Sequence, residues 1–144
     1  MMQRPIGFWL KLVDRLIDEG FDSLLREQRL TRRHWQVLNE LSKQAAAVAD
    51  LDRRLAPFLD AGEPTTRPVL DDLASRRWLE WTTGDHAVLT PQGVDAHAGL
   101  HQAVAAHRER VAAGIDGEEY AATLDVLRRM AENLGWVDHP RRTD

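Results

Sequence analysis

The order of segments in the middle third of the chain constrains its fold most. A helical segment with a Trp/Leu face, 30–41, is followed by a second helical stretch and by the turn signal 60–64, after which a further helix begins. Two short β-capable segments, 78–81 and 87–89, flank Gly84-Asp85, a pair typical of hairpins. A long helix comes next. This order predicts a winged helix-turn-helix, which places one helix in the major groove of DNA.

Two motifs of this region also carry a family resemblance. Leu73 is followed by a short charged stretch and the apolar pair Trp78-Leu79, and the hairpin closes on Leu-Thr-Pro-Gln-Gly at 89–93. In these motifs the chain resembles the MarR family of bacterial transcriptional regulators. In that family the recognition helix ends in L-x-x-x-G-[LW]-[VI] and the wing returns at L-T-x-x-G. The resemblance extends along nearly the whole chain and implies a dimeric regulator that binds DNA.

The sequence departs from the family pattern at two places. Arg77 stands where the family usually has Gly, and the segment 82–86 replaces a longer wing that carries an Asp-x-Arg pair. This short wing contains no Arg or Lys. We therefore expect any contact between the wing and DNA to lack the cation that the resemblance implies.

Capping residues indicate where the helices of the winged helix-turn-helix begin; we call this part, which is expected to contact DNA, the reading module. Thr31 is a plausible N-cap for a helix that turns Trp35, Leu38 and Leu41 inward. The Ala-rich stretch 44–59 is expected to form one continuous helix in which Phe58 packs. Thr66 is expected to cap the recognition helix. Arg67 and Pro68 would then occupy its first two positions.

Amphipathic helices are predicted on both sides of this module. Apolar residues recur every three or four positions over 5–27, which indicates a helix with a wide apolar stripe. Thr90-Pro91 predicts the start of a helix that reaches about residue 113, and Asp116 predicts the cap of a final helix. Trp136 follows near the exposed end of the chain. These apolar faces have no evident partner within so short a chain, so they are expected to interlock two copies.

Composition limits the chemistry. The 144 residues suit one domain, and the absence of cysteine excludes disulfides, thiolate metal sites and thiol-based oxidation switches. The chain has neither an apolar run of roughly 20 residues nor the regions of a signal peptide, so a cytoplasmic protein without membrane association is expected. The net charge is −4, yet residues 26–77 hold ten basic against eight acidic residues. A solvated mixed-charge surface remains the alternative interpretation of that small excess.

The expected DNA contacts lie at the start of the recognition helix and on neighbouring helices. Arg67 can donate two hydrogen bonds to a guanine, a contact worth about 1–3 kcal/mol of discrimination. The alternative is an ordinary capped helix start with one solvated arginine. The full set of expected contacts is Thr65, Thr66, Arg67, Lys43, Gln44, Arg53, Arg54 and Arg76.

A small aromatic effector is expected to bind where aromatic walls meet a few polar groups, near Trp9, Trp35, His97 and His101. His97 and His101 are four residues apart, a spacing that can share a metal ion, but no nearby carboxylate completes a site, so we predict neither a metal nor a cofactor. No phosphate loop, G-x-S-x-G elbow or H-E-x-x-H motif is present. The sequence therefore predicts no enzyme.

Together these observations predict a mainly α fold with a small β-hairpin wing, in one MarR-type domain over 1–144. The winged-helix module would span about 30–90, and the dimerisation helices 5–28 and 91–136. The resemblance implies a homodimer that represses transcription at a pseudo-palindromic operator and is released by a ligand. The alternatives are a winged-helix protein-interaction module without DNA binding and a small helical ligand-binding protein.

Overall fold

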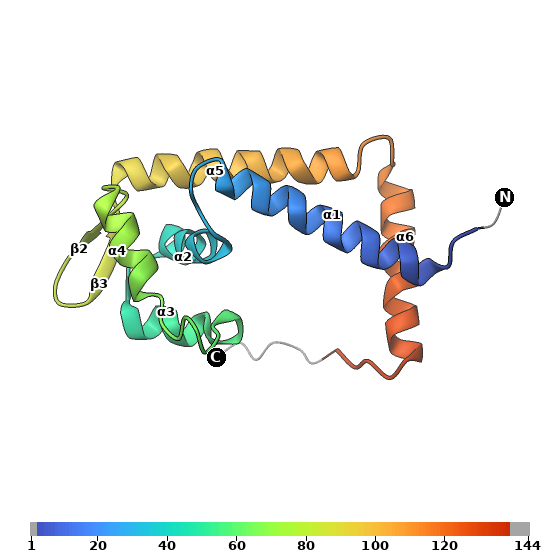
Figure 1. Ribbon diagram of the computed structural model, residues 1–144, viewed down its shortest axis with the longest axis horizontal. Coiled ribbons are helices and arrows are strands. Elements are labelled where there is room, and N and C mark those ends of the chain that lie inside the picture. Colours follow the sequence, from blue (N-terminus) through green and yellow to red (C-terminus); the bar gives the residue numbers. More distant parts are fainter. Residues whose placement is uncertain (1–2, 139–144) are drawn as a thin grey trace. The chain divides into compact units, whose positions relative to one another are not determined.

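The computed structural model describes residues 3–138 (Figure 1). Contacts within the chain divide these residues into two compact units, 3–107 and 108–138. The chain is mostly helical with one small sheet. Its elements in order are α1 (Ile6–Arg26), α2 (Arg32–Lys43), β1 (Ala46–Ala47), α3 (Val48–Arg54), the 3-10 helix η1 (Ala56–Phe58), α4 (Arg67–Ser75), β2 (Leu79–Trp81), β3 (His86–Leu89), α5 (Pro91–Val111) and α6 (Gly117–Asn133). This order confirms the predicted winged helix-turn-helix.

The sheet has three antiparallel strands in the order β1-β3-β2, one more than the predicted hairpin. Ala46 pairs with Ala87, and both side chains are buried. The prediction that the alanines near residue 46 are helical was wrong, because ladder hydrogen bonds and burial outweigh the helix propensity of alanine.

The third helix is also shorter than predicted. It begins at Val48 and ends at Arg54, after which η1 follows. Pro57 has no N–H to donate to a carbonyl four residues earlier, so an α-helix cannot continue through it without losing that bond. Phe58 was expected to pack but is 60% exposed, so that prediction was wrong.

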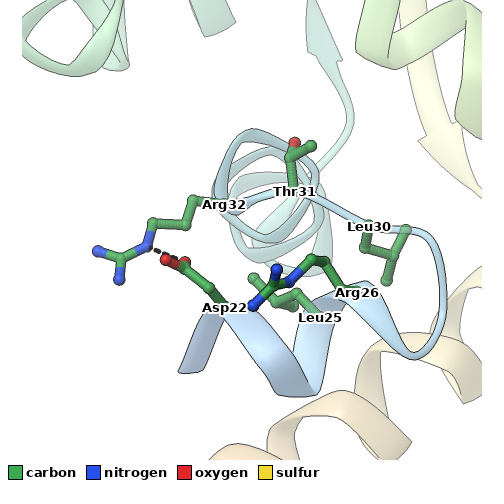
Figure 2. A pocket seen from close by; sticks show the side chains of 6 residues that line it. All are labelled: Asp22, Leu25, Arg26, Leu30, Thr31 and Arg32. Carbon is green, nitrogen blue, oxygen red and sulfur yellow. Dashed lines mark hydrogen bonds and ion pairs between the residues drawn. The ribbon is translucent and has the colours of Figure 1, made fainter. Parts of the chain in front are cut away.

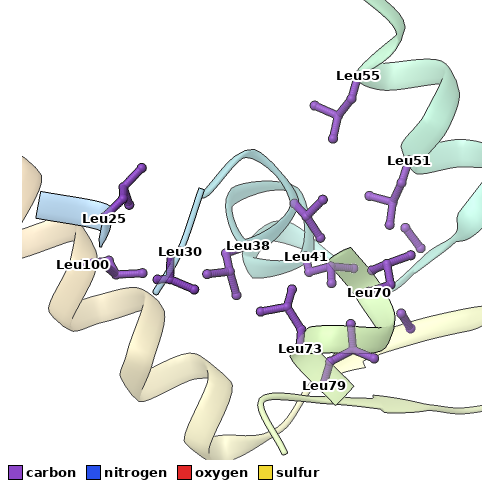
Figure 3. Packing of buried hydrophobic residues seen from close by; sticks show 13 residues of the cluster. Leu25, Leu30, Leu38, Leu41, Leu51, Leu55, Leu70, Leu73, Leu79 and Leu100 are labelled. Carbon is purple, nitrogen blue, oxygen red and sulfur yellow. The ribbon is translucent and has the colours of Figure 1, made fainter. Parts of the chain in front are cut away.

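One apolar core holds the first unit together (Figure 3). α2, α3 and α4 each contribute fully buried leucines, and α5 adds Leu100. The cluster consists of Leu25, Leu30, Val37, Leu38, Leu41, Ala46, Leu51, Leu55, Leu70, Leu73, Leu79, Ala87 and Leu100. Because this core fixes α4 against α2 and the sheet, the start of α4 is held in a defined place.

The end of α4 shows why a glycine would suit position 77, where this chain has Arg77. The Trp78 N–H donates to the Leu73 carbonyl and the Arg77 N–H to the Ala74 carbonyl, each at 3.0 Å. This is the Schellman arrangement, which needs a residue in the left-handed region. Arg77 occupies that position with φ 63°. An L side chain is strained in this region, so Arg77 performs a task that glycine performs at lower cost.

In the Leu-Thr-Pro-Gln-Gly segment, Thr90 caps α5 and close packing requires the glycine at position 93. The Thr90 hydroxyl accepts the Gly93 N–H at 3.1 Å and so caps α5, as predicted. A Cβ on Gly93 would lie 1.9 Å from the Trp78 carbonyl oxygen. Only glycine therefore allows α5 to begin this close to the wing.

A second glycine lets α1 approach α5 within the first unit. A Cβ on Gly20 would lie 2.4 Å from Cε1 of His107, whose Nε2 lies 3.2 Å from the Ile17 carbonyl oxygen. His107 is buried, and its Nδ1 is the one buried side-chain polar atom without a partner among the described residues. α1 otherwise exposes most of its apolar stripe: Ile6, Trp9, Leu10, Val13, Leu16 and Ile17.

The second unit consists of the end of α5, a turn and α6. Asp116 caps α6, as predicted, by accepting the Glu119 N–H at 2.8 Å. None of the 17 residues of α6 is buried. The exposed apolar residues of this unit include Tyr120, Leu124, Val126, Met130, Leu134, Trp136 and Val137. Across residues 3–138, no helix combines the length and the apolar character that crossing a membrane requires.

Candidate nucleic-acid interface

α4 opens at Arg67, as predicted. Its backbone N–H donates to the Thr65 hydroxyl at 3.2 Å, and Pro68 fits the first turn, where an N–H would have no helical acceptor. The Arg67 side chain is about half exposed (49%). A helix start with an accessible guanidinium is the arrangement that a helix-turn-helix presents to base edges and phosphates.

The Arg67 guanidinium is held on three sides. Its Nε donates to Oδ1 of Asp71 at 3.1 Å, and its Nη1 lies 3.7 Å from Oδ1 of Asp85 in the wing. Its Cζ lies 4.7 Å from the centre of the Trp81 ring at the end of β2, within cation–π range. We call Arg67, Asp71, Trp81 and Asp85 the arginine clamp.

Thr66 has a structural role. It stands at the N-cap position of α4, but its side chain makes no capping hydrogen bond, so the prediction that it caps the helix was wrong. Its burial leaves no surface for the expected DNA contact. It is fully buried, and its N–H and hydroxyl both donate to Oδ1 of Asp52, at 2.7 and 2.8 Å. Thr65 donates to the other oxygen of Asp52 at 2.8 Å. Burial raises the pKa of Asp52, but these three hydrogen bonds outweigh burial and leave the pKa below its usual value. Asp52 thus anchors the segment that leads into α4.

Arg76 is likewise committed to the fold. Its Nε donates to Oδ2 of Asp72 at 3.0 Å, and its two terminal nitrogens donate to the carbonyls of Gln28 and Arg29 at 2.9 and 2.7 Å. A phosphate contact would have to break this clasp between α4 and the loop before α2. The expected DNA contact of Arg76 would cost these hydrogen bonds, and it stays a prediction.

The remaining predicted DNA contacts lie on the surface. Nζ of Lys43 lies 3.7 Å from Oε1 of Glu40, and Nη1 of Arg54 lies 3.8 Å from Oε2 of the same residue. Nη2 of Arg53 donates to Oδ1 of Asp50 at 2.6 Å. Exposed ion pairs of this kind contribute about 0–1 kcal/mol, so a phosphate can replace the carboxylate at little cost. Gln44 is exposed just after α2. Contacts from these four residues stay predictions.

Two polar residues at the start of α2, Arg33 and His34, stabilise the module through hydrogen bonds that the sequence did not predict. Arg33 is buried and donates to the carbonyls of Phe58 and Glu63, at 3.0 and 3.3 Å. His34 shares a hydrogen bond of 2.8 Å with the Thr31 hydroxyl, and its Nε2 lies 2.9 Å from Oδ2 of Asp72. Their spacing continues the buried stripe of α2, which was the available signal in the sequence.

Three of the four predicted ligand residues come together. The Trp35 and His97 rings stack with centroids 5.6 Å apart, and His101 lies 6.1 Å from His97. Burial and then the neighbouring His101 lower the pKa of His97, whose Nε2 lies 2.8 Å from Oδ1 of Asn39. The aromatic neighbour of Trp9 is instead Phe8, at 5.2 Å. Within residues 3–138, no three His, Asp or Glu side chains gather as metal ligands would.

A hollow of about 310 Å³ lies beside the α1–α2 loop (Figure 2). Figure 2 shows the ion pair between two of its lining residues, Asp22 and Arg32. Nε of Arg32 lies 2.7 Å from Oδ1 of Asp22. The lining residues of the hollow are Asp22, Leu25, Arg26, Leu30, Thr31 and Arg32.

The three-helix arrangement, the wing and the exposed start of α4 define the class of the module as a winged helix-turn-helix. No protein-family model and no curated protein matches the chain. Solved structures do. The apo form of wild-type MarR from E. coli matches with a TM-score of 0.66 and 19% identity, covering 90% of this chain and 98% of that one.

Two further regulators match similarly. The PcaV transcriptional regulator of Streptomyces coelicolor has a TM-score of 0.69 and 20% identity, covering 91% of this chain and 98% of that one. BpsR of Bordetella bronchiseptica, whose DNA binding is regulated by 6-hydroxynicotinic acid, has a TM-score of 0.63 and 21% identity, covering 90% of this chain and 96% of that one. The chain has the fold of MarR-type regulators.

Proposed function

We propose that the protein is a transcriptional regulator that binds duplex DNA, and that it is not an enzyme. The observation that carries this proposal is the exposed start of α4, where Arg67 lies beside a wing in a fold that the chain shares with MarR of E. coli and PcaV of Streptomyces coelicolor. Arg67 would contact a guanine edge, and Thr65, Lys43, Gln44, Arg53 and Arg54 would contact bases or phosphates.

We further propose that the protein acts as a homodimer. α1 and α6 each expose an apolar face, and Leu124 and Trp136 are about half exposed although large apolar side chains stabilise a fold only when buried. A second copy of the chain would cover these faces and supply a second reading module. Two modules related by a twofold axis favour a pseudo-palindromic operator.

Ligand control by relief of repression is the third part of the proposal. BpsR responds to a small aromatic acid, and here Trp35, His97 and His101 offer stacking surfaces with a few polar atoms. Trp9 would contribute only if dimerisation brings it near them. Such a coupling is typically worth 1–3 kcal/mol.

One observation favours a second candidate, a winged-helix module that binds protein rather than DNA. The wing contains no Arg or Lys and places Asp85 beside the reading arginine. A protein partner with basic side chains would suit such a surface.

Selection from a random duplex pool tests the proposal and separates the candidates. We expect enrichment of an inverted repeat whose half-sites lie about one helical turn apart. Arg67→Ala should weaken binding to the selected duplex by about 1–3 kcal/mol for each half-site. Arg108→Ala, which removes an exposed arginine outside the winged-helix module, is the control and should leave affinity unchanged. No enrichment at low salt would favour the protein-binding module.

A further inference from the structure

The arginine clamp has more negative than positive charge. Asp71 and Asp85 both lie within ion-pair distance of one guanidinium, at 3.1 and 3.7 Å, and the Trp81 ring covers it at 4.7 Å. Asp85 lies in the wing segment 82–86, and Trp81 lies at the end of the strand β2 that leads into it. The wing, where a regulator usually carries a cation for DNA, therefore carries a carboxylate that pairs with the reading residue of α4.

We propose that Asp85 competes with DNA for Arg67 and so sets the affinity for the operator. This inference rests on the proposed function of Arg67. Asp71 accepts from Nε, whereas Asp85 lies 3.7 Å from Nη1, an ion pair without a hydrogen bond. A guanine that binds through the two terminal nitrogens would leave the bond to Asp71 in place and would compete with Asp85 for Nη1. In the free protein, Arg67 is therefore paired with Asp85 rather than available to a guanine.

The competition affects operator and random DNA differently. Binding to random duplex relies on phosphate contacts, which Lys43, Arg53 and Arg54 can make while Arg67 stays in the clamp. Binding to the operator requires Arg67 to be released. Removing Asp85 should therefore increase affinity for the operator more than affinity for random duplex.

The test compares Asp85→Asn with the wild-type chain on the selected operator and on a random duplex, at two salt concentrations. Glu80→Gln is the matched control, because Glu80 is exposed on β2 of the same wing and its substitution removes the same charge without touching the clamp. We expect Asp85→Asn to raise operator affinity about three- to tenfold, which corresponds to about 0.3–0.7 kcal/mol in each of two half-sites and lies within the range for one exposed ion pair. Glu80→Gln should give less than about a twofold change on either duplex.

A double substitution separates competition for Arg67 from general repulsion of phosphates. In an Arg67→Ala background, Asp85→Asn should lose its preference for the operator and behave like Glu80→Gln. Equal gains from Asp85→Asn with and without Arg67, or equal gains on both duplexes, would overturn the role of Asp85 and leave the proposed function intact. A wild-type chain that binds no duplex would overturn both. Unchanged thermal unfolding of each variant excludes an effect through the fold.

Discussion

α4 and α6 are both amphipathic helices, yet the apolar face of α4 is buried and that of α6 is exposed. In the first unit, Leu70 and Leu73 of α4 are completely buried against α2 and the sheet. In the second unit, α6 is nearly twice as long but has no fully buried residue, and Leu124 on its apolar face is 52% exposed. A periodic apolar face thus predicts a helix well but does not identify what covers the face. Elements of the same chain pack on the apolar face of α4, and we propose that a second chain packs on that of α6.

Truncating one leucine from each helix should show this difference most strongly. Leu70→Ala leaves a cavity in a closed core, so it should lower the free energy of unfolding by about 2–5 kcal/mol. Leu124→Ala should lower it by much less in the isolated chain and should instead weaken self-association. Urea unfolding at several protein concentrations measures both effects. Equal, concentration-independent losses from the two variants would remove the distinction.

Two glycines of α5, Gly93 and Gly99, differ in the same way: one faces a packed neighbour and the other faces open space. Gly93→Ala places a Cβ against the Trp78 carbonyl, and backbone cannot easily move aside, so we expect a loss of about 1–3 kcal/mol. Gly99→Ala meets nothing within 4 Å and should stabilise the helix by up to about 1 kcal/mol. Thermal unfolding of the two variants checks the opposite signs. A stabilised Gly93→Ala variant would mean that α5 does not pack on the wing as described.

The smallest expected effect concerns Arg77. Arg77→Gly should raise the free energy of unfolding by about 0.5–1 kcal/mol, because glycine adopts the left-handed conformation without strain. Arg76→Gly, one position earlier at φ −79°, is the control and should destabilise the protein, since it also removes the clasp to the Gln28 and Arg29 carbonyls. A destabilised Arg77→Gly variant would show that the Arg77 side chain contributes more than its backbone strain costs.

Local signals predicted much of this fold. Thr31, Thr90 and Asp116 cap their helices, and the start of α4 at Arg67 lies where Thr66 and Pro68 indicated. Gly84 was predicted to lie in the hairpin turn, and it has φ 61° between the paired strands β2 and β3. Such features depend on a few neighbouring residues, so the sequence specifies them directly.

Long-range pairings were not predictable in this way. β1 depends on Ala46 meeting Ala87 across 41 residues, and nothing local distinguishes Ala46 from a helical alanine. The same limit applies to the candidate site. Arg67 was identified from its position, but its pairing with Asp85 depends on how the wing packs beside α4.

If a second copy of the chain covers α1 and α6, the dimer presents two winged-helix modules, and the masses of the free protein and of its complex with the selected duplex show this. Sedimentation equilibrium should show a free protein of twice the 16.4 kDa chain mass and two chains on one duplex. Leu124→Glu, which places a charge on the apolar face of α6, should shift the free protein toward the monomer and weaken binding to the inverted repeat. A folded monomer that binds the inverted repeat one chain at a time, with unchanged affinity after Leu124→Glu, would contradict the account.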